Sequence, residues 1–173
     1  MSTAERTKSI QIFRAEDAPS LDDDGMMSPP TLAKEVKDEF DTSPLYDGQR
    51  VNVLFKGEGA DGFSLVHAWF GPGFRLPRHS HNADCLYYVI KGSAIMGTRV
   101  LGPGDGFFVK ADGRYTYTAG PDGIEILEFR SATTFDMTVY DQTVASWRPI
   151  MQAAKDNHEA WLATTATSGS AQT

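Results

Sequence analysis

The sequence predicts an all-β fold, an antiparallel barrel or sandwich with an N-terminal arm and a C-terminal helix. Between residues 51 and 130, short runs rich in β-branched and aromatic residues recur, such as VNVLF, FSLVHAWF and IEILEF. Glycine and proline turns separate these runs, for example at 71–73 and 102–104. Many short strands at regular spacing, with no long helical pattern among them, are typical of barrels and sandwiches.

The first 50 residues are polar and acidic, and we expect them to form an arm that precedes the barrel. Within the arm, residues 9–13 (SIQIF) could form a short strand, and residues 20–30 read as a loop. Residues 31–40 carry an apolar side chain at every fourth position. This spacing predicts a helix, with Thr31 as its N-cap.

The barrel is expected to span residues 51–140 and to be followed by a helix at 141–163. From Pro149 onward, apolar residues recur at helical spacing as far as Trp161, so this helix should pack one face on the barrel. His158 lies on or beside that face, where we expect a packing role. The small, polar tail at 164–173 is expected to be disordered.

Composition and charge exclude several classes of function. The formal net charge of −7 argues against binding to a nucleic-acid backbone. No run approaches the ~20 apolar residues of a membrane span. The N-terminal residues lack the apolar core of a signal peptide, and Cys85 is the only cysteine. We therefore expect a cytoplasmic protein with one reduced thiol and no internal disulfide.

The segment GFRLPRHSHNADCLYYVIKG, residues 73–92, carries the clearest chemical signal. His79 and His81 stand two residues apart at the entry to a predicted strand. Imidazoles that converge inside a barrel suit zinc, iron, copper or nickel, so the pair predicts a metal site. Because side chains alternate along a strand, Cys85 and Tyr87 should share one face, while Asp84 should point the other way.

This segment resembles the first motif of the cupin superfamily, in which a glycine, two histidines, a glutamate and a second glycine have this spacing. Residues 101–120, LGPGDGFFVKADGRYTYTAG, resemble the second cupin motif in the same frame. With flanking strands, the resemblance covers about 51–130. It implies a cupin-type jelly-roll barrel with ligands bound at its mouth. It also implies a homodimer, onto whose second subunit the N-terminal arm could swap.

Two of the four usual cupin ligands are replaced in this chain. Cys85 stands where the first motif has glutamate, and Tyr115 stands where the second motif has histidine. Cys85 is either a third metal ligand beside His79 and His81 or a small buried hydrophobic residue. Two histidines and a thiolate favour zinc or copper, and iron is a candidate because many cupins use it.

Further residues near the motifs are candidates for contact with a substrate. Tyr115 is the candidate general acid or base. Tyr117 shares a strand face with Tyr115. The residues predicted to bind substrate are Tyr117, Tyr87, Phe107 and Arg75. His67 lies on a predicted strand, where a core or surface role is expected in preference to metal ligation.

The sequence therefore predicts a metal-dependent small-molecule enzyme of the oxygenase, isomerase or lyase type. Its substrate would be an oxygenated organic molecule held in the barrel, since the fold itself does not select a reaction. The alternative is a non-catalytic cupin that binds or senses a small molecule and has a degenerate metal site. The loss of the glutamate and of the second-motif histidine favours that alternative.

Overall fold

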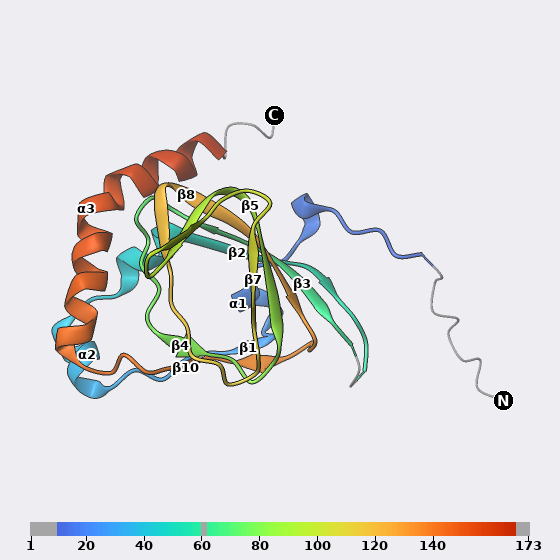
Figure 1. Ribbon diagram of the computed structural model, residues 1–173, viewed down its shortest axis with the longest axis horizontal. Coiled ribbons are helices and arrows are strands. Elements are labelled where there is room, and N and C mark those ends of the chain that lie inside the picture. Colours follow the sequence, from blue (N-terminus) through green and yellow to red (C-terminus); the bar gives the residue numbers. More distant parts are fainter. Residues whose placement is uncertain (1–9, 60–61, 169–173) are drawn as a thin grey trace.

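The computed structural model describes residues 10–59 and 62–168 (Figure 1). The strands are β1 (Met27–Ser28), β2 (Gln49–Lys56), β3 (Ser64–Phe70), β4 (His79–Ser80), β5 (Cys85–Met96), β6 (Arg99–Leu101), β7 (Gly106–Val109), β8 (Thr118–Arg130), β9 (Phe135–Asp136) and β10 (Thr138–Val139). The helices are α1 (Leu21–Asp24), α2 (Lys34–Glu39) and α3 (Val144–Ser168), with short 3-10 helices at Ala15–Asp17 and Ser43–Gly48. No helix in these ranges is both long enough and apolar enough to span a membrane.

One antiparallel six-stranded sheet dominates the fold. Its strand order is β2-β3-β8-β5-β6, and β7 also pairs with β5. Two small sheets face it, one from parallel β1 and β9 and one from antiparallel β4 and β10. The mostly-β architecture with one C-terminal helix is thus confirmed. Hydrogen bonding among the described residues does not close the strands into a ring, so the jelly-roll detail stays a prediction.

The strands alternate as the sequence predicted, which places the core inside the curved sheet. Along β5, Cys85, Tyr87 and Val89 are buried, while Leu86 and Tyr88 between them are exposed. The inward residues of β3, β5 and β8 pack together into the main apolar cluster. Figure 1 shows the strands curving around this interior, with α3 along one side.

Helix α3 is fixed to the barrel by Trp161, which is fully buried and donates its Nε1–H to the carbonyl of Pro72 at 2.9 Å. A Cβ atom on Gly71 would lie 2.3 Å from the Trp161 ring, so only glycine allows this approach. His158 lies 2.8 Å from the carboxylate of Asp47. The helix and the structural role of its histidine therefore agree with the sequence analysis.

Two features of the N-terminal arm differ from the prediction. Residues 10–13 form no strand, because Ile10 and Ile12 are 76% and 84% exposed with no strand beside them; Ser9 lies outside the described residues. The helix predicted at 31–40 is present as the shorter α2. Thr31 does not cap it, because the helix begins at Lys34 and its N-cap residue is Ala33. The Gln142 side chain accepts from the N–H of Ala33 at 2.6 Å and donates to the Thr31 carbonyl.

The boundaries at two other places also shift. The segment 20–30, predicted as a loop, contains α1 and β1. Helix α3 continues to Ser168, beyond the predicted end at 163, so the first part of the predicted disordered tail is helical. Residues 169–173 of that tail lie outside the described residues. The division of the chain into arm, barrel and helix stays a prediction.

Candidate functional site

A cavity of about 470 Å³ lies between the barrel interior and the N-terminal segment. Leu21, Met27 and Pro29 of that segment form part of its wall, which gives the arm a role that the sequence did not reveal. The polar groups that face the cavity include His79, His81, Tyr115, Tyr117, Glu128 and Arg130. Most of the remaining wall is apolar, as is usual for a small-molecule site of this size.

His79 and His81 are held by backbone contacts on one side of their rings. The Nδ1 atom of His79 lies 2.7 Å from the Pro77 carbonyl, and Nδ1 of His81 lies 2.5 Å from the Asp136 carbonyl. Since a carbonyl only accepts, each Nδ1 carries the proton and each Nε2 keeps its lone pair. Reciprocal 3.0 Å bonds between Asn82 and Asp136 position the turn that carries His81.

The same surroundings keep both imidazoles neutral. Burial is the main cause of a lowered pKa at His79. Burial, followed by the positive charge of Arg130, lowers the pKa of His81 to about 3. At neutral pH both rings are therefore in the deprotonated form that a metal ion requires.

The separation of the two histidine rings lies within the range of metal-bound pairs. Two imidazoles bound to one ion through metal–nitrogen bonds of about 2.1 Å have ring centroids roughly 4.5–5.2 Å apart. The centroids of His79 and His81 are 5.0 Å apart. Donation from Nδ1 to a backbone carbonyl is also the usual support of a metal-binding histidine. Within residues 10–59 and 62–168, no group of three or more His, Cys, Asp or Glu side chains is arranged to hold a metal.

Cys85 lies on the inward face of β5 but is not among the residues that line the cavity. It is 2% exposed, and burial, reinforced by Glu128, raises the pKa of its thiol to about 12. At neutral pH it is a buried thiol, which matches the hydrophobic alternative left open above. Its role as a third metal ligand stays a prediction.

A buried ion pair that was not predicted from the sequence lies on β8. Arg130 donates to the Glu128 carboxylate at 2.8 Å and to the Tyr87 hydroxyl at 3.2 Å. The Tyr87 and Tyr115 hydroxyls lie 2.5 Å apart, so the network runs from the ion pair to the cavity wall. Strand alternation in IEILEFR could have revealed it, because Glu128 and Arg130 continue the inward face begun by Ile124 and Ile126.

This network keeps its members in defined charge states. Burial opposes the charge of Arg130, but Glu128 outweighs it, so the pKa of Arg130 is raised. Burial is the largest cause of the raised pKa of Tyr115 and Tyr117, followed by Glu128. These phenols are therefore protonated and can donate hydrogen bonds.

Two buried polar atoms beside the cavity have no hydrogen-bond partner among the described residues. They are the Tyr117 hydroxyl and Nε of Arg130. Buried polar groups in folded proteins almost always have a partner, so such an atom calls for a ligand or a water molecule. Both residues line the cavity, which is where a ligand would lie.

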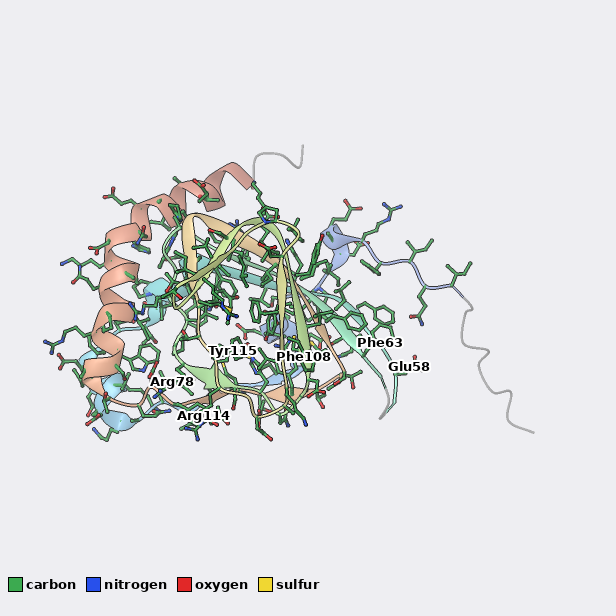
Figure 2. All side chains as sticks on the ribbon, viewed as in Figure 1. Glu58, Phe63, Arg78, Phe108, Arg114 and Tyr115 are labelled. Atoms are coloured by element: carbon green, nitrogen blue, oxygen red, sulfur yellow. The ribbon has the colours of Figure 1, made fainter. Side chains whose placement is uncertain are left out.

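Three of the five residues predicted to contact substrate do not line this cavity. Tyr87 and Phe107 are not among the residues that line the cavity. Their rings stack with centroids 4.5 Å apart, and the Tyr87 hydroxyl contacts the Tyr115 hydroxyl. Arg75 is exposed and also outside the lining. Tyr115 and Tyr117 line it, and contact with a substrate stays a prediction for all five residues. Figure 2 shows Tyr115 nearer the middle of the view than Arg78 and Arg114, which lie toward its lower edge.

Two further expectations agree with the structure. His67 lies on the outward face of β3, 3.6 Å from the Glu125 carboxylate, and does not join the cavity. Asp84 accepts a hydrogen bond from the N–H of Ala111 at 2.7 Å. It is also absent from the cavity lining, so it does not replace the missing glutamate.

No family model matches the sequence, and no curated protein matches it significantly. Among solved structures, the chain is similar to the polyketide cyclase RemF from Streptomyces resistomycificus, with 16% identity, a TM-score of 0.54, and coverage of 83% of this chain and 98% of RemF. An RmlC-like cupin from Shewanella frigidimarina NCIMB 400 matches at 26% identity and a TM-score of 0.41, over 50% of this chain and 78% of that one. KdgF from Halomonas sp. matches at 24% identity and a TM-score of 0.43, over 58% and 94%. The likeness to RemF shows a shared fold over most of this chain, and membership of the cupin superfamily stays a prediction.

Proposed function

We propose that this chain is a cupin-type small-molecule enzyme in which His79 and His81 hold a divalent transition metal. Zinc and iron are the leading candidates, and copper is a further one. The observation that carries the proposal is the pair of neutral rings, each held at Nδ1 by a carbonyl, with Nε2 left for a ligand. A bound metal would supply Lewis acidity toward a carbonyl or another oxygen of the substrate.

The cavity suits an oxygenated organic substrate with an apolar body. Phe70, Phe74 and Met137 provide apolar wall, and the volume is that of a small-molecule site. The Tyr117 hydroxyl and Nε of Arg130 are buried donors without a partner in the part of the chain that the structure describes, so a ligand oxygen would satisfy them. The apolar wall and the two buried donors together favour a ligand that has an apolar body and at least one oxygen atom.

The protein's own groups favour chemistry in which negative charge develops on a substrate oxygen. Tyr87 accepts from Arg130 and can donate to Tyr115, which leaves the Tyr115 proton for a ligand in the cavity. Preorganised donors of this kind stabilise an oxyanion. Glu128 is engaged by Arg130, so it does not act as a free base. This arrangement favours an isomerase or lyase over an oxygenase, with Tyr115 as the acid.

A non-catalytic binding or sensing cupin is the second candidate. The observation in its favour is that the described residues contain no group of three or more His, Cys, Asp or Glu side chains arranged to hold a metal. The Cys85 thiol, whose pKa is raised to about 12, also favours this candidate, because a protonated thiol is not a metal ligand. In such a protein the partnerless donors of Tyr117 and Arg130 would hold the ligand without a metal.

Calorimetric titration of the chelator-treated protein with Zn²⁺ distinguishes the two functions. The enzyme proposal expects saturable binding that His81→Gln abolishes. His158→Gln is the matched control and should bind normally, because His158 lies on α3 against Asp47. If Cys85→Ser also weakens binding, the thiol is a ligand. If Zn²⁺, Fe²⁺ and Cu²⁺ all fail to bind the wild-type protein, the binding module is the correct function.

A further inference from the structure

Part of the cavity wall comes from the N-terminal arm and not from the large sheet. Residues 20–30, which we call the arm wall, contain α1 and β1. Ser20 forms an isolated bridge with Asn52 of β2, and β1 pairs in parallel with β9. The apolar side chains that this segment adds to the cavity lining are Leu21, Met27, Pro29 and Pro30. The arm wall therefore takes part in enclosing any molecule that occupies the cavity.

The first half of the arm wall is fixed to β2. Pro19, directly before it, accepts a hydrogen bond from the N–H of Val53 at 2.9 Å. Asp24, the last residue of α1, forms an ion pair with Lys56 at 2.5 Å. These two contacts lie on either side of Leu21 in the sequence, so they hold its side chain against the cavity.

The second half of the arm wall is fixed to β9 and to the segment that precedes α3. Met26 is 1% exposed, and its carbonyl accepts a hydrogen bond from the N–H of Phe135 at 2.9 Å. The consecutive prolines at 29–30 restrict the backbone that follows. Beyond them, the Gln142 side chain donates to the carbonyl of Thr31 at 3.0 Å. Because both halves are anchored, the segment is a fixed wall of the cavity and not a lid.

The arm wall and the barrel offer a ligand different chemistry. On the barrel side, the Tyr117 hydroxyl and Nε of Arg130 are buried donors without a partner in the described part of the chain. Leu21 and Met27 present only hydrocarbon and a thioether, and proline has no N–H to donate. A ligand oxygen therefore gains hydrogen bonds on the barrel side, whereas an apolar group is favoured against the arm wall. This difference orients an occupant with its oxygen toward the barrel and its apolar end toward the arm.

We propose that Leu21 and Met27 are specificity-determining residues that limit the length of the apolar end of a ligand. The inference rests on the proposed small-molecule function of the cavity and does not require a bound metal. Affinity increases with the length of an apolar chain as long as each added group is buried. A chain that is too long meets the anchored arm wall and has to displace packed side chains, which lowers its affinity.

Calorimetric titration of the chelator-treated full chain with a series of 4-alkylphenols, from methyl to hexyl, tests the proposal. For the wild-type protein we expect the affinity to rise about fourfold with each added methylene and then to fall beyond a certain chain length. Met27→Ala removes the Cγ, Sδ and Cε atoms, so the longest chain that still gains affinity should grow by about two carbons. Met96→Ala is the matched control, because Met96 is also half-buried but does not line the cavity. Its affinity profile should equal that of the wild type.

The proposal is overturned if the wild-type protein binds none of the phenols, if Met27→Ala keeps the wild-type length limit, or if Met96→Ala shifts the limit equally. Circular dichroism checks that each variant is folded. Should Met27→Ala fail to fold, Leu21→Ala takes its place with the same direction of shift expected, since Leu21 is also half-buried and lines the cavity. Protein that shows the shift but binds no Zn²⁺ refutes only the metal, whereas protein that binds Zn²⁺ and phenols without the shift refutes only the role of the arm wall.

Discussion

Removal of the Arg130 guanidinium should destabilise the fold by about 3–5 kcal/mol. Arg130 is 1% exposed, donates to Glu128 and Tyr87, and lies 3.9 Å from the centroid of the Phe135 ring. Arg130→Met keeps an unbranched side chain of similar length against Phe135. It leaves the Glu128 carboxylate, only 9% exposed, without a compensating charge. The loss is large beside the 5–15 kcal/mol stability of a typical domain.

A second substitution separates this charge effect from lost packing. In Glu128→Gln/Arg130→Met both charges are gone, so the double variant should be more stable than Arg130→Met by roughly 2 kcal/mol. Urea unfolding followed by circular dichroism gives the free energies. The exposed pair Lys34 and Asp38 is the control, and Lys34→Met should change the urea midpoint little.

Two results would refute this reasoning. If Arg130→Met unfolds at the wild-type urea midpoint, the buried ion pair does not contribute to stability as its geometry implies. If the double variant is no more stable than Arg130→Met, the uncompensated carboxylate of Glu128 is not the cause of the loss.

Three further predictions follow from burial and close packing. In chelator-treated protein, the free energy of unfolding should decrease as the pH falls below 6.5, because the unfolded chain protonates His81 while the pKa of His81 in the folded chain is about 3. Urea unfolding at pH 5 should show a loss of about 2 kcal/mol from this residue, and the loss should be absent in His81→Gln. Alkylation of Cys85 by iodoacetamide should be about a thousand-fold slower in the native than in the unfolded protein, because a thiol pKa of about 12 in place of 9.0 lowers the fraction of reactive thiolate. A native alkylation rate within tenfold of the unfolded rate would contradict this. Gly71→Ala should lower the free energy of unfolding by about 1–3 kcal/mol through its clash with Trp161, whereas Gly102→Ala, with open space around it, should not.

The parts of the site that depend on local spacing could be predicted from the sequence. The two histidines are two residues apart on one short segment, and their separation along the chain already places both rings on the same side. Alternation along β5 likewise predicted that Cys85 and Tyr87 share the inward face. Tyr115 and Tyr117 were placed in the cavity by the same argument.

The parts that depend on long-range register could not be predicted. Arg130 pairs opposite Cys85, and Glu128 opposite Tyr87, only because β8 lies beside β5 in the sheet. Nothing near those residues in the sequence indicates that neighbour. The segment that enters α2 has the same character, since the Gln142 side chain that accepts from the N–H of Ala33 lies 109 residues further along the chain. Such contacts follow from the assembled fold and not from the local pattern.

The central claim is that His79 and His81 hold a metal, and the metal content of untagged protein, purified without added metal, tests it most directly. The wild-type protein and His158→Gln should contain near-stoichiometric zinc, iron or copper by plasma mass spectrometry. His81→Gln should contain almost none, because one Nε2 ligand is lost. Equal metal in His81→Gln and the wild type, or none in the wild type even after exposure to Zn²⁺, Fe²⁺ and Cu²⁺, would contradict the account.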